Sequence, residues 1–261
     1  MKKILVSLAA IVAVGALAVG GTIAFYNDSE LSSGNVFTAG TIDFTVDSKG
    51  AIYNDGTVAG SSWEAKDLTD EKFFSFDDIK PADRGSRHLS LHVGENDGWA
   101  CLLVANKIND ENTPIDPELI AGDTTDNGIQ DGELAQNTEV FVWQDNNSDG
   151  LYNAGDDALT AEDGETLYSL SDVVIADSTY GTPLTNASTR QVYIAWCAGD
   201  QTVDKSAGTI TCDGGGMGDK AQTDKFSADM IAYAVQVRNN ADFKCSDVDE
   251  YNEFTPVPQA G

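Results

Sequence analysis

Short segments in which apolar and polar residues alternate recur along this chain, and clusters of Gly, Asn and Asp separate them. Residues 40–47 place Ile42, Phe44 and Val46 on one face, and residues 87–93 repeat the pattern. A period of two is typical of a β-strand with one buried face. Because no regular helices come between these segments, the sequence excludes an alternating α/β fold and predicts an all-β, antiparallel β-sandwich.

Three further segments are predicted as strands because they are rich in β-branched and aromatic residues: 99–106, 139–143 and 190–197. Residues 226–237 have the same composition, but their periodicity also fits a short helix. Short helices are otherwise expected only near residues 117–120 and 167–175. We therefore predict a sandwich domain over residues 40–245, with a loop-rich insert at about 110–190 and a flexible tail at 246–261.

The charge of the chain narrows the classes of partner. Its 261 residues include 15 Lys and Arg against 43 Asp and Glu, which gives a formal net charge of −28. A protein that binds nucleic acid needs a basic surface to neutralise phosphates, so nucleic acid is excluded as a partner. The same imbalance favours solubility and the binding of cations.

The first 24 residues have the three-part layout of a secretory signal peptide. Lys2 and Lys3 precede an apolar run at 4–19, and small residues follow it. Cleavage is predicted after Ala24, so that the mature chain begins at Phe25. The alternative is an uncleaved membrane anchor, although the run is shorter than the ~20 residues that span a bilayer. We expect a secreted protein, extracellular or at the cell surface, that meets the membrane only during export.

Three motifs, in this order, resemble the TasA/camelysin family, whose members are exported through a SipW-type signal peptidase. The first is the run TIAFYNDSELSSGNVFTAGTIDFTVD (22–47), the second is DIKPADRG (78–85), in which Ala82 replaces the usual Gly, and the third is AQTDKFSADMIAYAVQVRNNADFKC (221–245). The resemblance implies a jelly-roll sandwich and a strand at residues 226–237. It also raises the possibility of peptidase activity, since some family members are described as metallopeptidases.

The four cysteines predict disulfides, because an even number in an exported chain favours pairing. Three pairings are possible. Cys197 and Cys212 flank one short loop, so the simplest framework is Cys197–Cys212 with Cys101–Cys245. The alternative is a zinc site made by all four cysteines, but no Cys-x-x-Cys pair is present to supply two ligands from one turn.

The segment DNNSDGLYNAGD (145–156) has the spacing of a calcium-binding loop of the EF-hand type. Its predicted ligands are Asp145, Asn147, Asp149, the carbonyl group of Leu151, and Asp156. Gly150 stands where the loop needs a sharp turn, and Asp156 replaces the usual Glu at the last position. The alternative is a solvated turn. The acidic stretch at 122–133, with Asp123, Asp126, Asp131 and Glu133, is expected either to complete this site or to be an ordinary loop.

His88 and His92 are the only histidines. On a helix they would share one zinc ion, but the alternation around them predicts a strand, where they lie roughly 13 Å apart. The chain also has no His-Glu-x-x-His motif and no Gly-x-Ser-x-Gly motif. We therefore predict no catalytic residues, although the resemblance leaves the question of enzyme activity open.

These observations favour a secreted structural subunit of an extracellular filament or biofilm-matrix fibre, which we expect calcium to stabilise. The mature amino-terminal segment, residues 25–39, is the candidate donor strand, which would add to an open sheet edge of a neighbouring copy. Other matrix or surface proteins are further possible partners. The alternatives are a camelysin-type extracellular metallopeptidase and a monomeric calcium-binding surface module.

Overall fold

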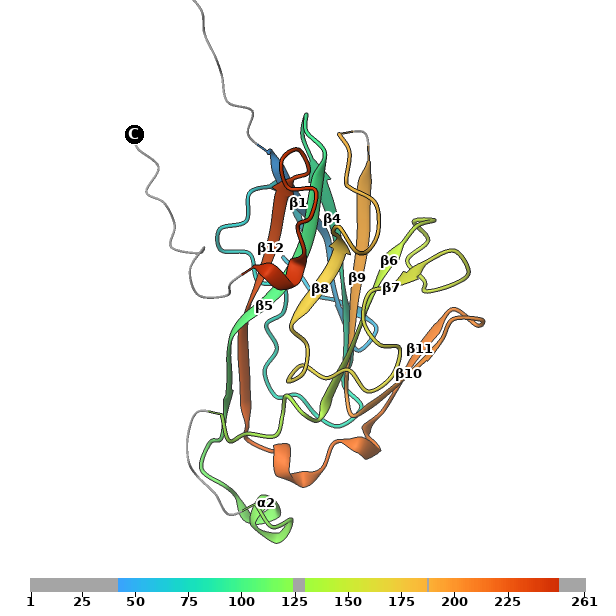
Figure 1. Ribbon diagram of the computed structural model, residues 1–261. Coiled ribbons are helices and arrows are strands. Elements are labelled where there is room, and N and C mark those ends of the chain that lie inside the picture. Colours follow the sequence, from blue (N-terminus) through green and yellow to red (C-terminus); the bar gives the residue numbers. More distant parts are fainter. Residues whose placement is uncertain (1–41, 124–129, 187, 249–261) are drawn as a thin grey trace, which may run out of the picture. The chain divides into compact units, whose positions relative to one another are not determined.

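Antiparallel strands form the framework of the structure, a computed structural model that describes residues 42–123, 130–186 and 188–248 (Figure 1). The chain divides into two units, 1–39 and 40–261, and all described residues belong to the second. The larger sheet has the order β2-β1-β4-β9-β6-β7, with β3 paired to β1. Its strands are β1 (Phe44–Tyr53), β2 (Gly56–Thr57), β3 (Trp63–Lys66), β4 (Arg84–Val93), β6 (Thr138–Asp145), β7 (Asp157–Ala158) and β9 (Thr189–Ala198).

The smaller sheet has three strands in the order β12-β5-β8, and a separate hairpin pairs β10 with β11. These strands are β5 (Gly98–Asp110), β8 (Asp172–Ala176), β10 (Asp200–Asp204), β11 (Thr209–Asp213) and β12 (Lys225–Gln236). The helical elements are α2 (Asp116–Ile120) and the 3-10 helices η1 (Gly214–Gly216), η2 (Asp219–Ala221) and η3 (Cys245–Asp247). The predicted all-β class is thereby confirmed.

The two sheets pack face to face around one apolar core. Leu91 of β4 and Ile194 of β9 come from the larger sheet, and Leu102 of β5 and Val173 of β8 come from the smaller one. All four side chains are at most 1% exposed. Burying a side chain of this size contributes about 1.5–3 kcal/mol, so the alternating apolar residues of the two inner faces hold the sandwich together.

The path of the chain is like that of a jelly roll. From β4 onward, β4, β6 and β9 lie in the larger sheet, whereas β5, β8 and β12 lie in the smaller one. Successive long strands thus cross from one sheet to the other, and all pairs between named strands are antiparallel. The stretch predicted as a loop-rich insert, about 110–190, also supplies β6 and β8 to this framework.

Most predicted strands are confirmed, including the strand at 226–237 that the family resemblance implied. The prediction of a helix near 167–175 is wrong. Residues 172–176 form β8, because their β-branched side chains pack in the core and their backbone pairs with β5. The helix predicted near 117–120 is present as α2. The predicted signal peptide, its cleavage site at Ala24 and Phe25, the candidate donor strand and residues 249–261 lie outside the described residues.

Candidate functional site

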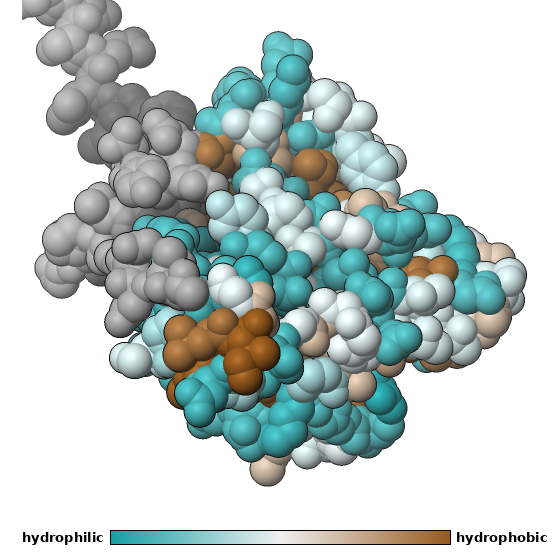
Figure 2. Space-filling view, turned by 90° about the horizontal axis from the view of Figure 1, so that it is seen from below, coloured by the Kyte–Doolittle hydropathy of each residue, from teal (hydrophilic) through white to brown (hydrophobic). Residues whose placement is uncertain are grey.

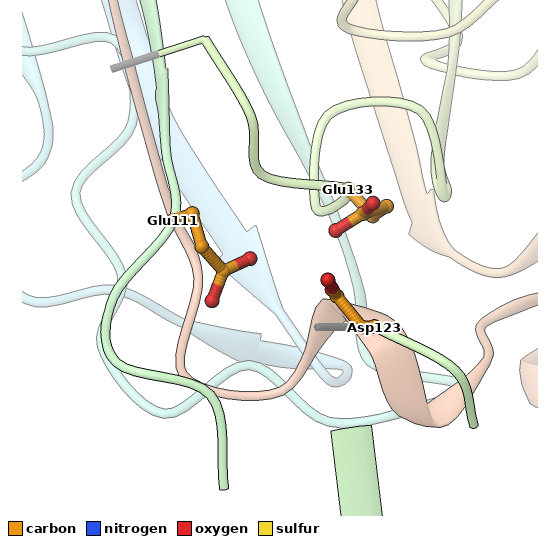
Figure 3. A group of neighbouring side chains, drawn as sticks. All are labelled: Glu111, Asp123 and Glu133. Atoms are coloured by element: carbon orange, nitrogen blue, oxygen red, sulfur yellow. The ribbon is translucent and has the colours of Figure 1, made fainter. Parts of the chain in front are cut away.

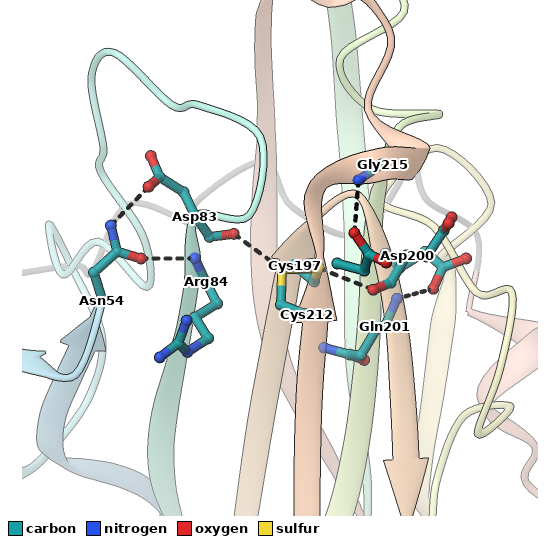
Figure 4. The surroundings of a disulfide bond; sticks show 10 residues. Asn54, Asp83, Arg84, Cys197, Asp200, Gln201, Cys212 and Gly215 are labelled. Atoms are coloured by element: carbon teal, nitrogen blue, oxygen red, sulfur yellow. Dashed lines mark hydrogen bonds between the residues drawn. A yellow bond between two sulfur atoms is a disulfide. The ribbon is translucent and has the colours of Figure 1, made fainter.

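Both predicted disulfides are present, so a zinc site made by the four cysteines is excluded. Cys197 of β9 bonds to Cys212 of β11, with their Cα atoms 5.4 Å apart. The Cys212 sulfur lies 3.5 Å from the carbonyl oxygen of Asp83, as Figure 4 shows. Cys101 of β5 bonds to Cys245 of η3, with Cα atoms 5.8 Å apart. The first bond fixes the β10–β11 hairpin, and the second fixes the carboxy-terminal segment to the smaller sheet.

The loop predicted to bind calcium forms the sharp turn that its sequence requires. Gly150 has a φ of +81°. The carboxylate of Asp145 accepts hydrogen bonds from the backbone N–H groups of Ser148 (2.6 Å) and Gly150 (2.8 Å). The carboxylate of Asp156 accepts them from Asn146 (2.9 Å) and Asn153 (2.8 Å). The carboxylates of Asp145 and Asp156 thus accept hydrogen bonds from backbone N–H groups of the loop itself.

The remaining predicted ligands of this loop lie on its surface. Asp149 accepts a hydrogen bond from the side chain of Asn153 at 2.7 Å, and Asn147 accepts one from the backbone N–H of Asp149 at 3.0 Å. Leu151 is 52% exposed. Calcium binding by Asp145, Asn147, Asp149, Leu151 and Asp156 stays a prediction.

The two histidines lie on β4, as the alternation predicted, and each ring has partners from neighbouring strands. His88 is buried, contacts Gln191 through Nε2, and packs edge-on against Tyr193. The Nε2 atom of His92 lies 2.7 Å from Asp47 Oδ2. Burial lowers the pKa of His88, which favours its neutral form. Both residues are therefore parts of the outer-face packing of the larger sheet.

A different group of carboxylates gathers where β5 ends and β12 begins. Two overlapping sets have oxygen atoms within 4.8 Å of one another and share Glu111: Glu111 with Asp123 and Glu133, and Glu111 with Glu118 and Asp224. We call these five residues the acidic cluster. Figure 3 shows the carboxylates of Glu111, Asp123 and Glu133 turned toward one another. The sequence had pointed only to Asp123 and Glu133.

Local structure explains how residues so far apart in sequence meet. Glu111 follows the last residue of β5, Asp224 precedes the first residue of β12, and these strands pair through Asp110 and Lys225. The carboxylate of Asp224 accepts hydrogen bonds from the backbone N–H groups of Glu133 (2.5 Å) and Leu134 (3.1 Å). The turn at 132–134 is thereby fixed against the strand ends.

The short helix α2 brings in the other two carboxylates. Glu118 is fully buried, and its carboxylate accepts hydrogen bonds from the backbone N–H of Ile115 and, at 3.2 Å, from the hydroxyl group of Thr223. Asp123 follows the helix, and its backbone N–H donates to the carbonyl oxygen of Glu118 at 2.9 Å. The helix thus orients both residues toward the strand ends.

The burial of the acidic cluster perturbs its protonation. Glu111 is 4% exposed. Burial, followed by the neighbouring carboxylate of Asp224, raises the pKa of Glu111 to about 8. Burial and the negative charge of Asp123 raise the pKa of Glu133 to about 7, and burial raises the pKa of Asp224. Such carboxylates must retain protons or bind a cation.

An open cavity of about 1480 Å³, lined by both apolar and charged side chains, lies between the sheets and extends along the first eight residues of β12. Its lining includes Val46 of β1, Ile194 of β9 and Met230 of β12, and residues 66–81 run along it. Among the described residues β12 pairs only with β5, so its other edge carries no strand there. Asp224 of the acidic cluster also lines this cavity.

No helix in the described part of the chain is long and apolar enough to cross a membrane.

One comparison with known proteins gave a match. Residues 1–99 match the family model described as camelysin metallo-endopeptidase, which confirms the predicted resemblance over that stretch. No curated protein matches the chain. Within residues 42–99, the part of the match that the structure describes, no three His, Cys, Asp or Glu side chains converge. The acidic cluster lies beyond the matched stretch.

Proposed function

From the camelysin pattern of residues 1–99 and the open edge of β12, we propose that this chain is a secreted structural subunit of an extracellular filament. In this proposal, residues 25–37 of one subunit add as a strand to β12 of the next. The single observation that carries it is the edge of β12, which has no partner among the described residues and borders the cavity between the sheets. An unpaired edge of this kind is a template for another chain.

The dimensions of the two segments agree. A 13-residue extended segment, the length of residues 25–37, spans about 43 Å, and the 12-residue strand β12 spans about 40 Å at ~3.3 Å per residue. Donor residues with alternating orientation would place their apolar side chains toward the cavity. Backbone hydrogen bonds supply affinity in such complexes, and the side chains fix the register.

The disulfides support an extracellular site of action. All four cysteines of the chain form disulfides, and such bonds persist in oxidising compartments. The Cys101–Cys245 bond closes 144 residues of the fold, so the subunit is stabilised independently of its neighbours. This suits a protein that must remain folded after export and before assembly.

The test compares the mature protein, residues 25–261, with a variant that starts at residue 38, by electron microscopy and sedimentation. We expect filaments from the mature protein and a folded monomer from the shorter one, because the donor's partners lie on another subunit. A synthetic peptide of residues 25–37 should block filament growth, whereas a scrambled peptide should not. Filaments from the shorter variant would refute donor-strand addition, and monodisperse mature protein would favour the monomeric module.

A further inference from the structure

We propose that the acidic cluster, Glu111, Glu118, Asp123, Glu133 and Asp224, binds a calcium ion, with the carboxylate of Glu111 as the central ligand. This inference is independent of the filament proposal. It also concerns a site different from the loop at 145–156.

The state of Glu111 is the observation that points to a ligand. Its side chain is 4% exposed, and neither carboxylate oxygen accepts a hydrogen bond from the described residues. The carboxylate is aimed at those of Asp123 and Glu133 (Figure 3). A buried carboxylate without a donor is costly unless a cation or a proton neutralises it. The fold therefore provides an oriented anionic group whose natural complement is a cation.

Further oxygen atoms around Glu111 are also available. Glu133 Oε2 and Asp224 Oδ1 are buried and accept no hydrogen bond within the described residues. None of the four ion pairs of the described residues involves Glu111, Glu118, Glu133 or Asp224. The second oxygen of Asp224 is held by two backbone N–H groups, and Glu118 is held by Thr223 and Ile115. The ligands are thus positioned before a cation arrives.

The donor set selects the class of metal. All five side chains are carboxylates, and the cluster contains neither imidazole nor thiolate, the ligands that zinc prefers. Calcium takes six to eight oxygen ligands and accepts bidentate carboxylates, whereas magnesium needs a near-ideal octahedron and keeps several waters. A group of five carboxylates, of which three are buried and two half-buried, therefore matches calcium best.

Calcium binding at the acidic cluster would stabilise the structure around α2. The ligands come from the end of β5, from α2 and the residue after its turn, from the loop before β6, and from the start of β12. Large hydrophobic residues on or beside this helix are exposed: Ile115 (41%), Leu119 (47%) and Ile120 (86%). Figure 2 shows a compact hydrophobic patch on the face of the molecule seen from below. Calcium would fix the helix through Glu118, and with it these exposed side chains.

The test uses mature, disulfide-intact protein from which a chelator has removed calcium. Calcium binding is measured by calorimetry as calcium chloride is added, and the melting temperature is measured with and without calcium. We expect the melting temperature to rise by about 5–10 °C at a calcium concentration a hundred times Kd, because only the native state assembles the ligands. Glu111→Gln should weaken binding at least tenfold and abolish this rise. In EGTA at pH 8 and above, the same variant should melt above the wild type, because it removes a buried carboxylate that is charged there.

Three controls make the result specific. Glu95→Gln removes one negative charge from an exposed position and should leave binding unchanged. Asp149→Ala tests the loop at 145–156, and calcium binding at the acidic cluster should survive it. Glu133→Gln should reproduce the loss if Glu111→Gln fails to fold. The proposal is overturned if the wild type binds no calcium, or if Asp149→Ala abolishes all calcium-dependent melting while Glu111→Gln keeps it.

Discussion

Removing the Cys101–Cys245 disulfide should destabilise the protein more than removing Cys197–Cys212. The two bonds close loops of very different length, with sequence separations of 144 and 15 residues. In the chain-entropy model the longer loop contributes ~5 kcal/mol and the shorter ~3 kcal/mol, because each cross-link restricts the unfolded chain. For a domain of this size these values correspond to losses of about 10–20 °C and 6–12 °C in Tm.

The folded state of the first variant should change little, so that the loss reports on the unfolded chain. Without the bond, the carboxy-terminal segment is still held by the stacking of Phe243 on Tyr233 and by the hydrogen bond from Trp99 Nε1 to the carbonyl oxygen of Asn240 (2.8 Å). The backbone N–H of Cys245 also donates to Asp177 at 3.1 Å. These contacts do not depend on the sulfur atoms.

The assay is guanidinium unfolding of two double variants, Cys101→Ala/Cys245→Ala and Cys197→Ala/Cys212→Ala, followed by tryptophan fluorescence. The first should lose about 2 kcal/mol more than the second, with unchanged near-ultraviolet circular dichroism in both. An equal or reversed loss would show that loop length does not determine the stabilisation, and that native-state packing around the bonds does.

Two further predictions concern single positions and pH. Ala82 adopts a φ of +70°, a conformation that residues other than Gly and Asn avoid. The substitution Ala82→Gly should therefore raise the free energy of unfolding by about 0.5–1 kcal/mol. Denaturant unfolding measures this change, and a lower free energy of unfolding in the variant would contradict the prediction. In EGTA, the stability conferred by Glu111 should fall as pH rises from about 4.5 to about 8, because the unfolded state releases its proton near the ordinary pKa of 4.5 whereas the folded state holds it until about 8. The melting temperature of Glu111→Gln, measured at pH 5, 6, 7 and 8, should therefore rise relative to that of the wild type as pH rises. A difference in melting temperature that stays constant across this range would disprove the raised pKa of Glu111.

The long strands could be predicted from sequence because their side chains meet two different environments. In β4, Leu89, Leu91 and Val93 face the core, and the residues between them face the other way. Residues 172–176 were misassigned because a short run of apolar residues has no period that separates helix from strand. Their pairing with β5 decided the outcome. Strands of two residues, such as β2 and β7, are too short to leave a pattern.

The acidic cluster could be predicted only in part because its members are scattered from residue 111 to residue 224. Asp123 and Glu133 stood out as acids in a Gly- and Asp-rich stretch, but Glu111, Glu118 and Asp224 carry no local motif. They meet because β5 and β12 pair along their full lengths and place the residues that flank them side by side. Pairing of this range is tertiary information, and a single sequence does not contain it in readable form.

The most direct test of assembly is hydrogen–deuterium exchange of the mature protein, as monomer and as filament. If a donor strand adds to the open edge of β12, peptides from residues 225–236 should take up less deuterium in the filament. Peptides from β8, at the opposite edge of the same sheet, should exchange equally in both states. Unchanged exchange in β12, or protection confined to β8, would contradict the account.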